Sequence, residues 1–236
     1  EVAVFRNTGS DAINSSSRGE DVENARRVAE KAGLVPSLLL GGTKLNLGLE
    51  AAIEDYRRLI SNTAALGASW LRDCGTSNEA HYDDYYALMQ ETSPYAEECG
   101  VAITLKPHGG ITLTVQDLVN AYNQVDRSGF GICYDPGNII YYTKGEHRPE
   151  TDLDLLAPKV SNLIIKDCVL ENGNPDVMVT PGDGLVDFGR VIAILREGGF
   201  QGPMYVECVG GVSLDEINHN VKSTLGFIRN LTAEKQ

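Results

Sequence analysis

Several apolar runs of this chain end in ionisable residues, and this feature constrains the fold most. A continuous apolar run is typical of a strand that is buried on both faces, as in a parallel sheet covered by helices. Charged residues at the ends of such strands lie where parallel barrels bind their ligands. We therefore expect one active site assembled from several strand ends. The runs occupy residues 103–108 (ITLKPH), 132–138 (ICYDPGN), 163–167 (LIIKD) and 204–207 (MYVE).

Glycine recurs along the chain at a regular interval. Each of five glycines follows an amphipathic segment and directly precedes an apolar run, as glycines at helix C-termini do. Their separations of 34, 33, 29 and 70 residues indicate a strand-and-helix unit of about 33 residues, with two units in the longest interval. The glycines are Gly33, Gly67, Gly100, Gly129 and Gly199, and the predicted strands cover residues 2–5, 37–40, 70–73, 102–106, 131–135, 163–166 and 204–207.

The number of units predicts the fold class. Seven units are one fewer than the eight that close a (β/α)8 TIM barrel. We predict a single α/β domain over residues 1–236 with this fold, whose first βα unit is missing because Glu1 already lies within an apparent strand. The alternative, an open doubly wound sheet, is disfavoured because no Gly-rich dinucleotide fingerprint follows the first strand. Apolar stripes should pack the helices on the sheet, among them Leu49, Ile53, Tyr56 and Ile60, and Leu214, Ile217, Val221, Leu225 and Ile228.

The charge of the chain restricts its partners. A formal net charge of −13 over 236 residues disfavours nucleic acid and anionic membranes, since both are polyanions. No apolar stretch reaches the length of about 18 residues that spans a bilayer, and no basic leader opens the chain. We expect a cytoplasmic protein with a small-molecule substrate, although Glu1 leaves a processed leader open and a homo-oligomer is possible. Five cysteines without a Cys-x-x-Cys spacing predict reduced thiols.

At the predicted strand ends the sequence resembles the xylose isomerase-like TIM barrels. That family includes sugar isomerases, ketose 3-epimerases, inosose dehydratases and endonuclease IV. Its members carry Glu-Pro-His, Asp-x-Gly-His or Asn, His-x-Lys-Asp, Gly-x-Gly-x-x-Asp-Phe and a last-strand Glu, in that order. The corresponding stretches here are residues 106–108 (KPH), 135–138 (DPGN), 164–167 (IIKD), 182–188 (GDGLVDF) and Glu207. The resemblance spans nearly the whole chain and implies the barrel fold and carbohydrate chemistry.

The resemblance also implies a divalent cation held by two Glu, one Asp and one His. Asp135 and Glu207 match that set, whereas Lys106 stands in place of a Glu and Ile164 in place of the His. In one interpretation, the Lys106 ammonium lies between the two carboxylates and replaces the cation as an electrostatic catalyst. In the other, manganese, magnesium, cobalt or zinc binds to Asp135, Glu207 and His108. Both interpretations stay open at this point.

The remaining candidates bind substrate or move protons. We assign Glu207 as the base and Asp135 as the group that orients Lys106 or a metal. The resemblance implies that Lys166 faces the substrate, and we assign it as a catalytic residue. Lys166 and Asp167 are adjacent in a strand, so their side chains should diverge. The predicted substrate-binding residues are His108, Asn138, Asp167, Arg6 and Asp73.

These groups predict a reaction class. Lysine, carboxylate and histidine around a sugar carbonyl can move a proton from the α-carbon and form an enediolate. We predict an isomerase or epimerase of an unphosphorylated sugar or keto-sugar, because Asp183 and Asp187 would repel a phosphate at the Gly182 loop. The alternatives are a lyase or dehydratase of a keto-sugar or inosose, and a non-catalytic sugar-binding barrel. An endonuclease is disfavoured because the acidic chain lacks a basic groove and the set of histidines that a trinuclear metal centre requires.

Overall fold

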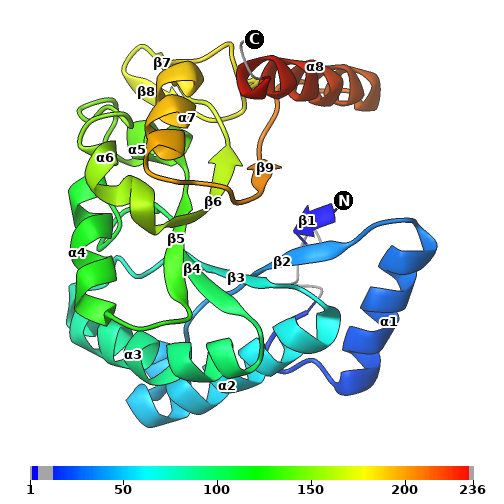
Figure 1. Cartoon of the computed structure of the whole chain (residues 1–236), viewed down its shortest axis with the longest axis vertical. Helices are drawn as coiled ribbons and strands as arrows, with labels where there is room; N and C mark the ends of the chain where they lie inside the picture. Colours follow the sequence, from blue (N-terminus) through cyan, green and yellow to red (C-terminus); the bar gives the residue numbers. More distant parts are fainter. Residues whose placement is uncertain (1, 5–12, 234–236) are drawn as a thin grey trace. The chain divides into compact units, whose positions relative to one another are not determined.

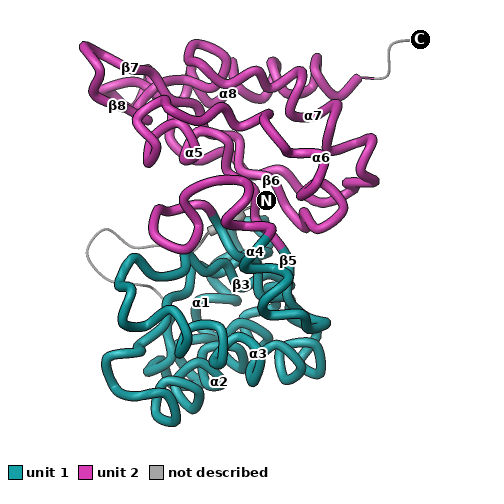
Figure 2. The backbone as a smooth tube through the Cα atoms, turned by 90° about the vertical axis from the view of Figure 1, so that its left-hand side faces the viewer, with its two compact units in different colours: residues 1–106, 120–131 teal, residues 107–119, 132–236 magenta. Residues whose placement is uncertain are grey.

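The structure is a computed structural model that describes residues 2–4 and 13–233 of the chain. Two compact units divide the chain (Figure 2). Unit 1 comprises Glu1–Lys106 and Asn120–Gly131, and unit 2 comprises Pro107–Val119 and Ile132–Gln236. The assignment of residues 1–236 to one domain stays a prediction, as does the loss of a first βα unit.

Unit 1 contains four parallel strands that follow one another in chain order. Apolar residues set the register, since Leu39 lies opposite Leu71 and Leu71 lies opposite Ile103. Helices α2 and α3 pack side by side along these strands (Figure 1). The elements are β1 (Val2–Val4), α1 (Gly19–Lys31), β2 (Pro36–Leu40), α2 (Leu49–Leu66), β3 (Trp70–Asp73), α3 (Tyr82–Glu98) and β4 (Ala102–Leu105).

Unit 2 also contains parallel strands, which are neighbours in the order β5, β6 and β9. An antiparallel hairpin, β7 and β8, is inserted after β6 and turns at Asn172 and Gly173, both of which have positive φ. The elements are β5 (Phe130–Tyr134), α5 (Pro136–Tyr142), α6 (Leu153–Leu156), β6 (Val160–Ile165), β7 (Val169–Glu171), β8 (Asn174–Asp176), α7 (Phe188–Glu197), β9 (Met204–Val206) and α8 (Leu214–Thr232). Helix α4 (Val115–Val125) and strand β5 each contribute residues to both units.

The predicted strands and their spacing are confirmed. Six strands begin within one residue of the predicted position, and β6 begins three residues earlier, at Val160. Strand β5 is buried at every position, as expected for a strand covered on both faces. The five recurring glycines all have φ between 70° and 88°, a conformation that L side chains rarely adopt. The βα repeat in the sequence therefore corresponds to a repeat in the structure.

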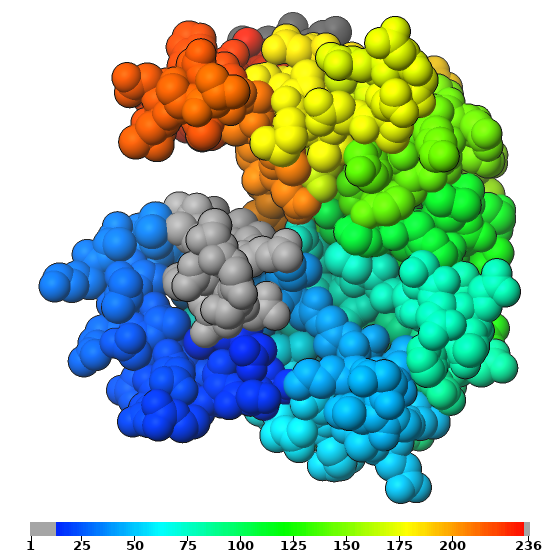
Figure 3. Space-filling view, turned by 180° about the vertical axis from the view of Figure 1, so that it is seen from behind, coloured from blue at the N-terminus to red at the C-terminus, as the bar shows by residue number. Residues whose placement is uncertain are grey.

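The prediction that apolar helix stripes pack on the sheet is right for α2 and wrong for α8. Tyr56 and Ile60 of α2 are buried. In α8, by contrast, Leu214, Val221 and Leu225 are 73%, 43% and 46% exposed, and the helix lies at the surface (Figure 3, orange). Strand β9, which precedes α8, has only three residues and therefore offers little sheet surface to cover.

Two predictions from the sequence were that no segment spans a membrane and that the cysteines are reduced thiols. Among the helices that the structure describes, none combines the length and the apolar character needed to cross a bilayer. All five cysteines lie outside disulfide bonds. Burial raises the pKa of the Cys168 thiol to about 11, so that this thiol stays protonated at neutral pH.

Candidate active site

The ends of β5 and β6 approach each other through the first turn of α5. Asp135 follows β5 as the N-cap of α5, and its Oδ1 accepts a hydrogen bond of 3.0 Å from the amide of Asn138. Pro136 occupies the first turn of the helix, where a missing amide hydrogen costs nothing. A Cβ atom at Gly137 would lie 2.6 Å from the carbonyl oxygen of Lys166. Only glycine therefore lets α5 approach the end of β6 this closely.

The side chains at these strand ends converge on one ammonium group. The Nζ atom of Lys166 lies 2.5 Å from Oε1 of Glu207, 3.2 Å from Oδ1 of Asn138 and 3.4 Å from Oδ2 of Asp135. We call these four residues the Lys166 cluster. The Lys166 side chain is 5% exposed and the Asp135 side chain is fully buried, whereas the Glu207 side chain is 28% exposed. Solvent and ligands therefore reach the cluster at Glu207.

The carboxylates keep the buried ammonium charged. Burial by itself would lower the pKa of Lys166, but the charges of Asp135 and Glu207 and the hydrogen bond that Lys166 donates to Glu207 raise the pKa above its usual value. Lys166 is accordingly a fixed cation at neutral pH. With both carboxylates ionised, the cluster carries one net negative charge. A buried ammonium with partners on several sides can stabilise negative charge that develops on a bound substrate.

Asp167 points away from this cluster, as predicted for adjacent strand residues. Its carboxylate is buried and accepts hydrogen bonds of 2.8–3.0 Å from four backbone amides. Three of these amides belong to the glycine loop of residues 182–188, and Asp167 occupies this cradle of amides from within the protein. The assignment of Asp167 as a substrate-binding residue stays a prediction. The four donors are the amides of Cys168, Gly182, Gly184 and Val186.

His108 is exposed and pairs with Tyr142, which is not among the predicted substrate-binding residues. Its Nε2 atom lies 2.8 Å from the hydroxyl of Tyr142, and the two ring centroids are 4.8 Å apart. Asn138 links this pair to the Lys166 cluster, because its side-chain amide donates to the carbonyl of Pro107 at 2.7 Å. Asn138 and Tyr142 are four residues apart and share one face of α5. That spacing was the available signal for Tyr142.

In unit 1, Asp73 lies among neutral donors. Its carboxylate accepts hydrogen bonds from the hydroxyls of Tyr85 at 2.9 Å and Tyr56 at 3.2 Å, and from the amide of Gly75 at 2.8 Å. Burial raises the pKa of Asp73 and outweighs the opposite effect of these donors. Burial also raises the pKa of both tyrosines well above the usual range. The hydroxyls therefore remain hydrogen-bond donors at neutral pH.

Two further candidates belong to the N-terminal part of the chain. Lys106 is 2% exposed and directly follows β4, and its backbone amide donates to the carbonyl of Asp73 at 2.8 Å. The catalytic role of Lys106 and the substrate-binding role of Asp73 stay predictions. Arg6 lies outside the described residues.

Sequence comparison identifies the family to which this arrangement belongs. A family model for the xylose isomerase-like TIM barrel matches residues 2–231. The chain belongs to the xylose isomerase-like TIM barrel family. Both the family resemblance at the strand ends and the predicted barrel fold are thereby confirmed.

Individual relatives of this xylose isomerase-like barrel include sugar-modifying enzymes. The 3-oxo-isoapionate decarboxylase of Pectobacterium atrosepticum is 25% identical over 163 residues, which are 66% of this chain and 58% of that protein. The chain spans about half the length of the curated relatives it matches. A xylose isomerase-like protein from Mycobacterium smegmatis, solved in complex with magnesium, has a TM-score of 0.75 at 19% identity and covers 93% of this chain and 81% of its own.

A further structural neighbour is an epimerase. The D-psicose 3-epimerase of Clostridium cellulolyticum H10, solved with D-tagatose, has a TM-score of 0.74 at 15% identity, over 91% of this chain and 84% of its own. At these identities the two solved structures show the shared fold alone.

The Lys166 cluster does not fit the divalent cation that the barrel family implies. Over residues 2–4 and 13–233, no three His, Cys, Asp or Glu side chains are grouped so that they could hold a metal. Asp135 and Glu207 converge on an ammonium, and the Nε2 atom of His108 faces the Tyr142 hydroxyl. Two carboxylates beside a fixed cation are a poor donor set for a second cation.

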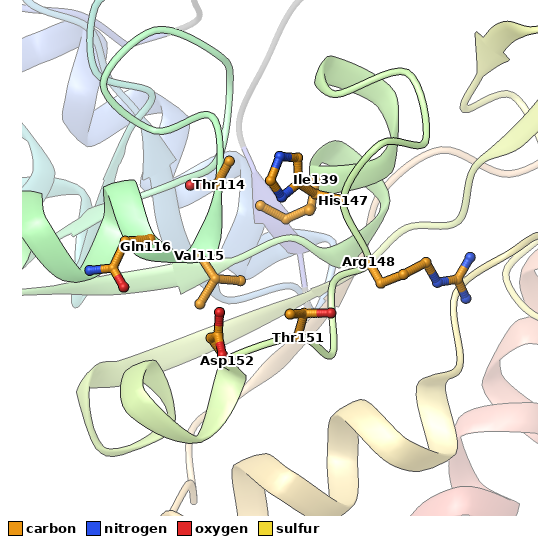
Figure 4. Close-up of a pocket in the computed structure, with 8 residues that line it drawn as sticks. All are labelled: Thr114, Val115, Gln116, Ile139, His147, Arg148, Thr151 and Asp152. Atoms are coloured by element: carbon orange, nitrogen blue, oxygen red, sulfur yellow. The ribbon is translucent and has the colours of Figure 1, made fainter.

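A small cavity in unit 2 lies beside the N-terminus of α4. Its volume is about 90 Å³, below the several hundred Å³ typical of ligand pockets. Arg148 extends away from the other lining residues and donates to the carbonyl of Leu185 at 2.8 Å (Figure 4). Because of this small volume, we do not assign the cavity as the sugar site. Its lining comprises Thr114, Val115, Gln116, Ile139, His147, Arg148, Thr151 and Asp152.

Proposed function

We propose that this chain is a carbohydrate-active isomerase or epimerase that abstracts a proton from the carbon next to a carbonyl. The observation that carries the proposal is the contact between Glu207, a partly exposed carboxylate, and the buried ammonium of Lys166 at 2.5 Å. A base and a fixed positive charge are thus side by side, as enolisation requires. Support also comes from the epimerase and decarboxylase among the similar proteins.

In the proposed reaction, Glu207 takes the α-proton. The C–H bond breaks, an O–H bond forms on the carboxylate, and the electron pair moves through the new C=C bond onto the carbonyl oxygen. Glu207 becomes neutral as it gains the proton, so its attraction for Lys166 falls. The ammonium then donates to the enediolate oxygen, which has acquired the negative charge. The negative charge next to Lys166 thus moves from Glu207 to the enediolate oxygen, and the net charge of the site is unchanged.

Asp135 and Asn138 hold the ammonium in place during this transfer. The ammonium donates hydrogen bonds to Glu207 at 2.5 Å and to Asn138 at 3.2 Å, and it forms an ion pair with Oδ2 of Asp135 at 3.4 Å. Asp135 is fixed by its bond to the α5 amide, and Asn138 by its bond to Pro107. Among the side chains of the Lys166 cluster, only that of Glu207 is appreciably exposed. The substrate oxygen therefore replaces Glu207 as the acceptor of one N–H of the ammonium. His108 and Tyr142 supply ring and hydroxyl groups suited to sugar hydroxyls.

An unphosphorylated substrate agrees with the charges of unit 2. The backbone amides that could hold a phosphate are bonded to Asp167. The Lys166 cluster has a net negative charge when its carboxylates are ionised, which disfavours a dianionic phosphate nearby. Delivery of a proton to the opposite face of the same carbon gives an epimer, and protonation of the former carbonyl carbon gives an isomer.

A lyase is the second candidate function, and the decarboxylase relative favours it. Loss of carbon dioxide from a 3-oxo acid breaks a C–C bond and leaves the electron pair on the same carbonyl oxygen. Elimination of water begins with the same deprotonation and then expels a hydroxyl group from the β-carbon. Lys166 would stabilise the enolate in each of these reactions.

Hydrogen exchange tests the proposed function. The protein would be incubated in deuterated water with unphosphorylated ketoses and keto-sugars, and the α-proton followed by NMR. We expect deuterium to enter the α-position with the wild type and with Glu171→Gln, an exposed control, but not with Glu207→Gln. Release of water or carbon dioxide would indicate the lyase. Ligand binding without exchange or product would contradict catalysis and favour a sugar-binding barrel.

A further inference from the structure

We propose that the ammonium of Lys166 takes the place of a divalent cation in this chain, where Lys106 and Ile164 stand in place of two of the family's ligands, and that Lys166 keeps metal from the two carboxylates that remain. The proposal concerns the composition of the site and not the reaction. It would hold for an isomerase, a lyase or a sugar-binding protein alike. Its basis is the position of Nζ between Asp135 and Glu207, two carboxylates from different strand ends.

The ammonium and a metal would compete for the same space. A divalent cation bound to carboxylates lies about 2.0–2.6 Å from their oxygens. The Nζ atom already lies 2.5 Å from Glu207 and 3.4 Å from Asp135. A cation that bridged the two carboxylates would therefore contact the ammonium itself. Repulsion between two such charges in a buried site is large, because water screens it poorly.

Lys166 has little freedom to move aside. Its side chain is 5% exposed, and its Cγ atom lies 3.0 Å from the Cβ position of Gly137, so the backbone of α5 encloses the aliphatic part. The Oδ1 atom of Asn138 is directed at the ammonium because the amide nitrogen of the same side chain donates to Pro107. The helix and the amide together hold the ammonium between the carboxylates.

Without a metal, the ammonium already offsets one of the two carboxylate charges of the cluster. One ammonium and two ionised carboxylates leave one net negative charge, which the exposed edge of Glu207 shares with solvent. Addition of a divalent cation would leave a net positive charge beside a lysine that is itself buried. Removal of the lysine would leave two converging carboxylates, which is the simplest arrangement that attracts a cation.

Titration with manganese tests the proposal on the purified chain. Electron paramagnetic resonance measures free Mn²⁺ directly and requires no substrate. We expect no stoichiometric binding by the wild type up to millimolar Mn²⁺. Lys166→Met, which keeps the length of the side chain but not its charge, should bind Mn²⁺ at least ten-fold more tightly than the wild type. Lys166→Arg, which keeps the charge, should behave as the wild type.

Each outcome decides the proposal. One equivalent of Mn²⁺ on the wild type would overturn it, and this measurement does not depend on whether any variant folds. Binding by Lys166→Met alone would support it, whereas no gain over the wild type in folded Lys166→Met would show that Lys166 is not what excludes the metal. Thermal unfolding of the wild type gives a second readout: its midpoint should be the same with Mn²⁺ as with a chelator. A failed exchange experiment would leave these results unaffected, so the two proposals can fail separately.

Discussion

Asp73 in unit 1 and Asp135 in unit 2 are buried aspartates at strand ends, but they have different partners. Two tyrosine hydroxyls and an amide donate to Asp73, and burial raises its pKa. Asp135 instead lies 3.4 Å from an ammonium, which in turn contacts a partly exposed glutamate. Buried carboxylates at strand ends can therefore have either neutral or charged partners. A fixed counter-charge next to a base that ligands can reach is the more informative feature.

Replacement of the counter-charge should have the largest effect. In Lys166→Met we expect the rate of α-proton exchange to fall about 1,000-fold, the upper range for loss of one donor to a developing oxyanion. The measurement is exchange into deuterated water by NMR, at saturating substrate. Lys106→Met is the matched comparison, because Lys106 is also buried but belongs to unit 1. A loss confined to Lys106→Met would move the electrostatic role to Lys106, where the sequence analysis placed it.

Asp167 extends the comparison to a carboxylate held by neutral donors in unit 2. Asp167→Asn replaces one acceptor oxygen by a donor, so two backbone amides lose their partner. We expect the free energy of unfolding to fall by about 2–6 kcal/mol, because each of the two buried unsatisfied groups costs roughly 1–3 kcal/mol. Urea unfolding measures this change. Asp183→Asn, in the same loop but exposed, is the control and should change little. Equal effects in the two variants would contradict a structural role for the amide cradle.

The raised pKa of Asp73 should make stability depend on pH. Unfolded Asp73 titrates near pH 3.9, and the folded protein releases this proton only at a higher pH. The contribution of Asp73 to stability is therefore fully present below the unfolded pKa and is lost as pH rises through the folded pKa. Between the two values the slope is at most about 1.4 kcal/mol per pH unit. Urea unfolding of wild type and Asp73→Asn from pH 4 to 7 should show this decline only in the wild type; parallel curves would refute it.

The fold was predictable because its signals are periodic and local. Apolar runs and the glycines that precede them depend on backbone conformation and burial, which the sequence records directly. The hairpin of β7 and β8 was not predicted, although Asn172-Gly173 is a typical sequence of a tight hairpin turn and both residues have positive φ. The exposure of α8 was not predictable, because an apolar stripe does not specify which surface covers it.

The candidate site was predictable in membership but not in its contacts. The strand ends supplied Asp135, Lys166 and Glu207, and the structure brings these three together. The position of the ammonium depends on how α5 packs against β6, a long-range contact that requires Gly137. The sequence could not show that Asp167 occupies the amides of a loop 15 to 19 residues further along the chain.

The smallest expected effects concern two tyrosine hydroxyls, one in each unit. Tyr142 faces exposed His108 in unit 2, whereas Tyr85 is fully buried against Asp73 in unit 1. We expect Tyr142→Phe to raise the KM for sugar by about 2–5-fold with little change in kcat or stability, since an exposed hydrogen bond contributes about 0.5–1.5 kcal/mol. Tyr85→Phe should instead lower the free energy of unfolding and leave KM unchanged. Steady-state kinetics and urea unfolding of both variants measure the two effects.

If Tyr142→Phe destabilised the fold as much as Tyr85→Phe, the hydroxyl of Tyr142 would have to be regarded as part of the structural framework. An increase in KM alone would place His108 and Tyr142 at the substrate, because a hydroxyl that only supports the fold does not alter substrate binding selectively.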